Sequence, residues 1–66
     1  MELKIEFGKR GEMIRTAEWY MDDEYLRYDG RADWCLIPLE IITSIMTFNQ
    51  KRGSWKVLWK EMEAEN

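Results

Sequence analysis

Carboxylates are the main chemically active side chains of this 66-residue chain, which has thirteen Asp and Glu residues, one cysteine and no histidine. General acid–base catalysis most often relies on histidine, and the thiol of Cys35 has no imidazole to activate it. A pair of carboxylates can hydrolyse a glycoside only beside a substrate cleft, and a chain of this length has little material to build one. We therefore expect no enzymatic activity and a buried, structural Cys35.

The acidic residues also lack the spacing of a metal site. A calcium-binding EF-hand loop needs oxygen ligands at alternate positions, then a glycine, then a late glutamate. The carboxylates near Gly30 do not follow that order, although a run of three begins at Asp22. The lack of histidine and the single thiol argue against a classical zinc site. We expect no metal and no cofactor.

Residues 18–34 combine six carboxylates with five aromatic rings and only two arginines. Like charges at this density repel each other and reduce folding stability, which favours a use for them outside the chain. Tyrosine and tryptophan are frequent at binding hot spots, and carboxylates around them accelerate encounter with a basic partner. The predicted partner-binding residues are an acidic ridge, Glu18, Asp22, Asp23, Glu24, Asp29 and Asp33, and an aromatic set, Trp19, Tyr20, Tyr25 and Tyr28.

An acidic ridge of this kind fits a basic protein surface. Basic grooves are often nucleic-acid sites, so carboxylates can stand where phosphates would lie. We therefore predict a small inhibitor or modulator, a nucleic-acid mimic that binds a basic and DNA- or RNA-associated protein, similar in size and charge to phage and mobile-element products. The competing interpretation is an ordinary solvated surface whose aromatic rings point into the core.

The alternative function is direct binding of nucleic acid by the basic C-terminal segment. Rings stack on bases while cations meet phosphates in single-strand binders. Against this, the net charge of the chain is −3, which weakens the long-range attraction that such binders use, and both tryptophans fit a core equally well. The residues concerned are Lys51, Arg52, Trp55, Lys56, Trp59 and Lys60.

Charge is unevenly distributed along the chain. The net charge is −5 over residues 18–40 and +4 over residues 41–60.

Hydropathy and cysteine content indicate where the protein functions. Met1 is not followed by the apolar stretch of a signal peptide, and the longest apolar run, residues 34–39, is far shorter than the roughly 20 residues of a membrane span. A single cysteine fits a reducing compartment. We expect a cytoplasmic protein without membrane contact.

Period-two alternation predicts a strand over residues 2–7, and the glycine-bounded turn at 8–11 predicts a hairpin with the next segment. Residues 12–21 fit a strand or a helix, and we prefer the strand. Residues 25–28 and 32–37 are expected to form further short strands. Residues 55–60 again fit both periods, and we favour a closing strand, because early lysines and late glutamates oppose a helix dipole.

The clearest helix signal begins at Pro38. Proline is favoured at the first helical position, and the negative charge of Glu40 is favoured in the first turn. An apolar stripe from Leu39 to Met46 follows, and Gly53 is the expected end of the helix. The sequence thus predicts an α+β fold: a small antiparallel sheet packed against one helix at about residues 38–51, within a single domain at 1–62 followed by a frayed tail at 63–66. A homodimer that buries apolar surface or pairs edge strands is a further expectation.

Overall fold

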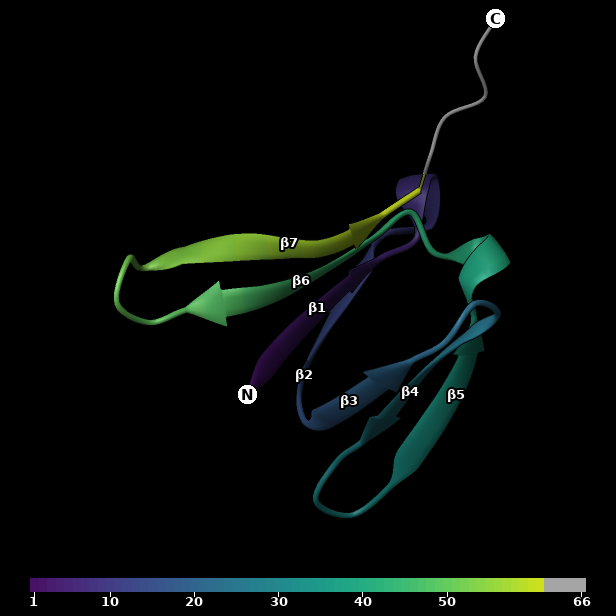
Figure 1. Cartoon of the computed structure of the whole chain (residues 1–66), viewed down its shortest axis with the longest axis horizontal. Helices are drawn as coiled ribbons and strands as arrows, with labels where there is room; N and C mark the ends of the chain where they lie inside the picture. Colours follow the sequence, from purple (N-terminus) through teal and green to yellow (C-terminus); the bar gives the residue numbers. More distant parts are fainter. Residues whose placement is uncertain (62–66) are drawn as a thin grey trace, which may run out of the picture.

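Short alternating segments of the chain form seven strands and two 3-10 helices in the computed structural model, which describes residues 1–61 (Figure 1). Each strand pairs antiparallel with its neighbours. The strands are β1 (Glu2–Glu6), β2 (Glu12–Thr16), β3 (Glu18–Met21), β4 (Tyr25–Asp29), β5 (Trp34–Pro38), β6 (Ser44–Asn49) and β7 (Ser54–Lys60), and the helices are η1 (Gly8–Arg10) and η2 (Leu39–Ile41).

The strands are divided between two sheets. Sheet A has the order β2-β1-β6-β7, and sheet B has the order β3-β4-β5. The chain passes from β2 in sheet A to β3 in sheet B through one residue, Ala17, which is buried. It returns to sheet A through η2. The N–H of Ala17 donates to the carbonyl of Met1 over 2.9 Å, and the N–H of Leu39 donates to the carbonyl of Glu24 over 2.8 Å. Backbone hydrogen bonds therefore fix both crossings between the sheets.

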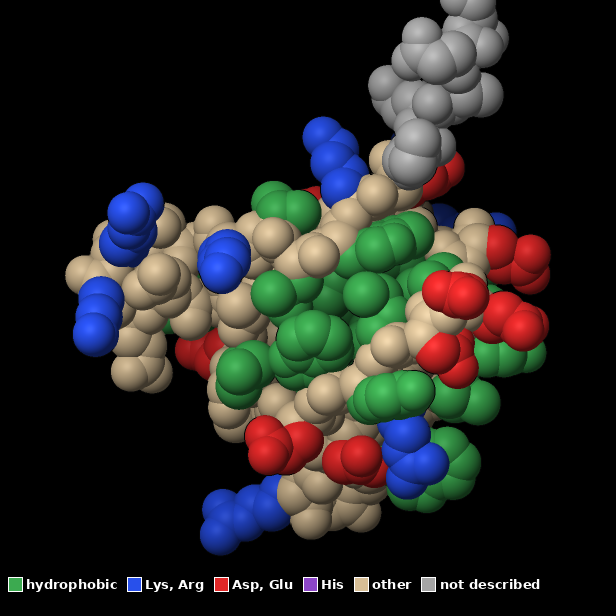
Figure 2. Space-filling model, in the orientation of Figure 1, with side chains coloured by type: hydrophobic (Ala, Val, Ile, Leu, Met, Phe, Trp, Pro, Cys, Tyr) green, Lys and Arg blue, Asp and Glu red, His purple; other side chains and the backbone are tan. Residues whose placement is uncertain are grey.

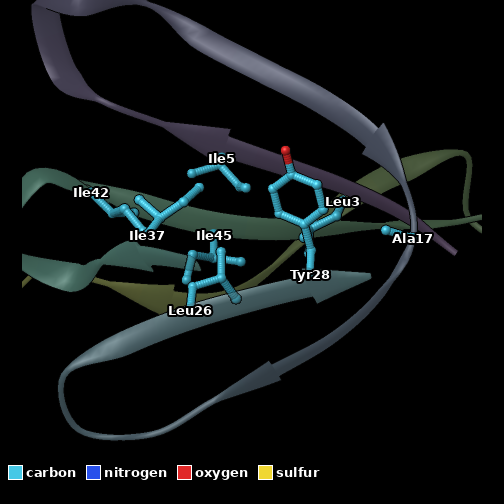
Figure 3. Packing of buried hydrophobic residues seen from close by; sticks show 8 residues of the cluster. All are labelled: Leu3, Ile5, Ala17, Leu26, Tyr28, Ile37, Ile42 and Ile45. Carbon is cyan, nitrogen blue, oxygen red and sulfur yellow. The ribbon is translucent and has the colours of Figure 1, made fainter. Parts of the chain in front are cut away.

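One apolar core lies between the two sheets (Figure 3). Leu3 and Ile5 project into it from β1, and Leu26 and Tyr28 project into it from β4, because alternate side chains of a strand point to the same face. The buried set is Leu3, Ile5, Ala17, Leu26, Tyr28, Ile37, Ile42 and Ile45. Since both sheets contribute to this cluster, each sheet depends on the other for its buried face.

The predicted α+β fold is wrong, because residues 38–51 contain no α-helix. The segment finishes β5, makes the three-residue turn η2 and continues as β6. Its β-branched residues, which lose side-chain freedom in a helix and suit a strand, are Ile41, Ile42, Thr43, Ile45 and Thr47.

Pairing with other strands satisfies the backbone of this segment. The N–H of Thr43 donates to the carbonyl of Glu6 over 2.8 Å, and β6 lies between β1 and β7 in sheet A. The apolar stripe that suggested a helix therefore belongs to a strand that is covered by neighbours on both edges. Pro38 precedes only one 3-10 turn, which closes with a hydrogen bond from the N–H of Ile42 to the carbonyl of Leu39.

The strands other than β6 lie close to the segments where they were predicted. The N-terminal hairpin is present as β1 and β2, with Ile5 opposite Met13. The segment 12–21 is extended as predicted, but it contributes to two sheets because the chain crosses at Ala17. The predicted strands at 25–28, 32–37 and 55–60 correspond to β4, β5 and β7. The predicted frayed tail at 63–66 lies outside the described residues, and no helix within residues 1–61 has the length or hydropathy to cross a membrane.

The hairpin of β6 and β7 projects away from sheet B (Figure 1). Its turn is ordered by Asn49, whose Oδ1 accepts hydrogen bonds from the N–H groups of Lys51 and Arg52 at 3.0 and 3.2 Å. Gly53 closes the turn with a φ of +65°, and its N–H donates to the carbonyl of Asn49 over 2.8 Å.

Replacing Gly53 with alanine tests this turn. No atom lies within 4 Å of the position that a Cβ would occupy, so only the left-handed backbone opposes the change. We expect the free energy of unfolding to fall by about 1–2 kcal/mol, measured by urea denaturation. The exposed neighbour Lys51 is the control, since Lys51→Ala should change stability by less than about 0.5 kcal/mol. Equal effects of the two substitutions would contradict the strained turn.

Candidate functional site

The outer face of sheet B carries the candidate site. Tyr25, Arg27 and Asp29 point outward from β4, while Leu26 and Tyr28 between them point into the core. Adjacent strands continue two rows across this face: Arg27 lies between Tyr20 and Leu36, and Asp29 lies between Glu18 and Trp34. We call this surface the sheet B face, and its residues are Glu18, Tyr20, Tyr25, Arg27, Asp29, Trp34 and Leu36.

Large apolar side chains on the sheet B face are unusually open to solvent. The exposed fractions are 65% for Tyr20, 60% for Trp34, 50% for Leu36 and 39% for Tyr25. Single exposed apolar residues are common on protein surfaces, but a contiguous group marks a contact surface. All three strands contribute to this group, so it forms a patch on a paired sheet.

Arg27 organises the centre of the patch. Its guanidinium carbon lies 4.8 Å from the centre of the Trp34 ring, and its Nη2 lies 3.1 Å from Oδ1 of Asp29. A cation over an indole face is attracted by the negative face of the ring. Arg27 therefore holds the Trp34 ring in one orientation while the ring stays exposed, and it also offsets one carboxylate charge.

The six carboxylates of the predicted acidic ridge form two groups. Glu18 and Asp29 are Cα partners on β3 and β4, and Asp33 lies beside them in the β4–β5 loop, where its carbonyl accepts from the N–H of Gly30 over 2.7 Å. We call these three the strand-end cluster. The turn cluster, Asp22, Asp23 and Glu24, lies at the opposite end of β4, about 13 Å away at 3.3 Å per residue.

The structure thus does not gather the acidic residues into one ridge. Apolar side chains of the sheet B face separate the two clusters, and Arg27 pairs with Asp29. Figure 2 shows carboxylates around the β3–β4 turn and η2, at the right of the view. The arrangement is a group of exposed apolar side chains around Arg27, with acidic groups at both ends. The role of these residues in partner binding stays a prediction.

Asp22 fixes the geometry of the turn cluster. Its Oδ1 accepts hydrogen bonds from the N–H groups of Glu24 and Tyr25, both at 2.8 Å. These bonds favour the ionised form and lower the pKa of Asp22 below its usual 3.8. The stabilisation is complete above pH 3.8 and is lost as the pH falls through the lowered pKa. The turn therefore keeps its shape and its negative charge at neutral pH.

The predicted aromatic set divides between the two faces of sheet B. Tyr20 and Tyr25 are exposed, whereas Tyr28 is buried and Trp19 is half-buried against the core. Burial, followed by the neighbouring thiol of Cys35, raises the pKa of Tyr28 above its usual 10.0. Tyr28 and Trp19 thus contribute to the core, and their role in partner binding stays a prediction. Cys35 is a half-buried free thiol on the neighbouring strand, opposite Tyr28.

The sequence analysis missed Trp34 and Leu36 as surface residues. Within the apolar run at 34–39, the structure turns Trp34 and Leu36 outward and Cys35 and Ile37 inward. Every residue of that run is apolar, so the sequence has no alternation in hydropathy that could have identified the exposed ones.

Exposure of a single indole gives a measurable prediction. Trp34 is exposed, while Trp19, Trp55 and Trp59 are half-buried. We expect Trp34→Phe to remove most of the fluorescence that acrylamide quenches readily, because the quencher must meet the indole in solution. Trp19→Phe is the matched control and should leave the readily quenched fraction in place. Loss of that fraction in the control would contradict the exposed position of Trp34.

A pocket of about 520 Å³ lies next to the turn cluster. It is lined by Met21, Asp22, Asp23, Leu39, Glu40, Trp59 and Glu61. A smaller hollow of about 290 Å³ adjoins it, lined by Asp23, Glu24, Tyr25, Pro38, Leu39 and Glu40. Because Tyr25 belongs to the sheet B face and Leu39 to both hollows, the pocket and that face form one continuous surface.

The basic residues predicted to bind nucleic acid are also divided. Lys51, Arg52, Trp55 and Lys56 lie at the tip of the β6–β7 hairpin, which we call the hairpin tip, where blue side chains lie at the left of Figure 2. Trp59 and Lys60 lie at the other end of β7, opposite Ile45 and Ser44. The ring of Trp55 contacts Phe48 with ring centres 5.2 Å apart and has the Lys4 ammonium 4.7 Å from its centre.

Within residues 1–61, no three acidic or cysteine side chains are placed to hold a metal ion. No family model, curated protein or solved structure matches this chain.

Proposed function

We propose that this chain is a small, non-catalytic protein-binding module that docks on a basic protein through the sheet B face. The observation that supports this proposal is the group of exposed Tyr20, Tyr25 and Trp34 side chains on three paired strands. Rings on a sheet lose little conformational freedom on binding, and tryptophan and tyrosine are frequent hot-spot residues.

The charge of the surrounding segment gives the chemistry of the partner. Residues 18–40 carry a net charge of −5, and the two acidic clusters lie at opposite ends of the apolar patch. A complementary surface has an apolar centre with lysine or arginine at both ends. The partner is therefore a basic protein that functions in the same compartment, for which we propose the cytoplasm.

Matched surface variants test this proposal. Immobilised wild-type protein should capture a basic protein from a cell extract, and the variant Tyr20→Ser/Trp34→Ser should fail to capture it. The control is Ile14→Ser/Val57→Ser, because Ile14 and Val57 are exposed by 44% and 52% on strands of sheet A. Equal loss of capture in both variants, or equal retention, would reject the sheet B face as the binding surface.

Mimicry of nucleic acid is one form of this proposal, and competition tests it. If the captured protein binds DNA or RNA through its basic surface, an oligonucleotide should displace it from the immobilised chain. If saturating oligonucleotide does not reduce capture, the chain and the nucleic acid do not share a binding site on the partner. That result would reject mimicry.

The second candidate function, binding of nucleic acid, is supported by the hairpin tip. A hollow of about 450 Å³ there is lined by Asn49, Arg52, Ser54, Trp55 and Lys56. Labelled single-stranded oligonucleotide is the probe, and binding that weakens with salt is expected from phosphate contacts. Lys56→Glu should abolish such binding, whereas Lys60→Glu at the far end of β7 should reduce it less. The absence of binding at low salt would exclude this function.

A further inference from the structure

The pocket beside the turn cluster has an apolar floor and an acidic rim. Met21, Leu39 and Trp59 form the floor, and all three are half-buried against the core. The rim consists of four carboxylates, Asp22, Asp23, Glu40 and Glu61. None of the described residues that line the pocket is basic. In Figure 2, apolar side chains fill the centre of the view and carboxylates border them on the right.

This lining fits a particular kind of side chain. Lysine and arginine carry a cationic head on an apolar stem, and a tryptophan ring attracts a cation. The apolar floor contacts the stem, while a carboxylate accepts hydrogen bonds from the charged head. Metal binding fits less well, because the carboxylates in residues 1–61 do not converge as metal ligands.

The size and position of the pocket agree with a peptide ligand. Sites for small molecules typically measure about 300–1,000 Å³, so about 520 Å³ holds one long side chain with its flanking backbone. The adjoining hollow shares Asp23 and Glu40 with the pocket and reaches Tyr25 on the sheet B face. A segment bound to that face can therefore extend into the pocket without leaving the protein surface.

We propose that this pocket binds one lysine or arginine side chain of the partner protein. The proposal rests on the proposed function for the identity of the partner as a basic protein. The pocket then sets specificity: the sheet B face supplies contact area, and the pocket selects a cation at a fixed distance from it.

Peptide binding monitored by nuclear magnetic resonance tests the pocket directly. The probes are acetyl-Gly-Gly-Arg-Gly-Gly-amide and the same peptide with neutral citrulline in place of arginine. The arginine peptide should shift the indole N–H resonance of Trp59, assigned with Trp59→Phe, and leave that of Trp34 unchanged. The citrulline peptide should bind at least about ten times more weakly. Equal binding of the two peptides would overturn the proposal.

Matched carboxylate variants separate the pocket from general attraction. Asp23→Asn/Glu40→Gln should raise the Kd for the arginine peptide at least about tenfold. The control Glu18→Gln/Asp33→Asn removes the same number of charges from the other end of sheet B and should change Kd by less than about twofold. Equal effects of the two pairs would show that only net charge matters. If the first pair disturbs the fold, the single variant Glu40→Gln is measured instead, with an increase in Kd still expected.

Three further outcomes are distinguishable. If the Trp59 resonance shifts with protein concentration alone and Lys51→Ala/Arg52→Ala removes that shift, a second copy of this chain occupies the pocket and the proposal fails. If the arginine peptide binds as expected but Tyr20→Ser/Trp34→Ser still captures the partner, the proposed function fails while the pocket stands. If capture depends on the sheet B face but the arginine peptide does not bind, the proposed function stands and the pocket fails.

Discussion

Leu26→Ala is expected to remove most of the free energy of unfolding at room temperature. Leu26 has no exposed surface and lies in the core between the two sheets. Removing buried atoms from such a position costs about 2–5 kcal/mol through lost burial and the remaining cavity. A core of this size rarely supplies more than about 3–5 kcal/mol of net stability, so the substitution removes most of it. Thermal and urea denaturation followed by circular dichroism measure the effect.

Leu36→Ala is the matched control for this prediction. Leu36 has the same side chain on the neighbouring strand, but half of it is exposed on the outer face. We expect the free energy of unfolding to change by less than about 1 kcal/mol. If the two substitutions destabilise the protein equally, sheet B does not bury the face described above.

Trp34→Ala is expected to weaken binding of the captured partner at least thirtyfold. Truncation of a hot-spot tryptophan costs about 2 kcal/mol or more, which corresponds to roughly that factor in Kd. Trp34 has the features of such a residue, since 60% of its surface is exposed in the free protein and Arg27 holds its ring. Most of the change should occur in the dissociation rate, measured by surface plasmon resonance.

Val57→Ala provides the control for binding. Val57 is exposed by 52% on sheet A, and its truncation should change Kd by less than about twofold if sheet B carries the interface. Carboxylates of the strand-end cluster act differently from Trp34, because Glu18→Gln should mainly slow association and reduce its dependence on salt. A loss of affinity for Val57→Ala as large as for Trp34→Ala would place the interface elsewhere.

Local alternation predicted most of the strands but neither β6 nor the architecture. Apolar residues alternate with charged residues over residues 2–7, which is enough to predict a strand. The buried positions of β1 follow that alternation. Residues 38–51 satisfy a helical stripe and a strand pattern together, and the choice depends on whether strands such as β1 and β7 are available as partners. That information is tertiary, so the helix signals at Pro38 and Glu40 were misleading. The crossing of the chain from sheet A to sheet B at Ala17 also depends on tertiary contacts, so local sequence does not predict it.

The candidate site was predictable in composition and not in geometry. The sequence identifies Tyr20 and Tyr25 as aromatic residues near carboxylates, but only the direction of each strand shows that they are exposed while Trp19 and Tyr28 are not. The division of the acidic residues into two clusters follows from the pairing of Glu18 with Asp29. The pocket could not be predicted, because Met21, Leu39 and Trp59 come from three separate elements.

The hairpin tip and the turn cluster also affect how the molecule approaches a charged surface. Cations gather at the end of the β6–β7 hairpin, and carboxylates gather at the opposite side of the view in Figure 2. Separated charges of opposite sign give the molecule an electric dipole, which a field rotates before any contact forms. Near a positively charged surface, the protein therefore turns its hairpin outward into solvent and arrives with the turn cluster leading. For the basic partner proposed above, this orientation brings the turn cluster to the partner first.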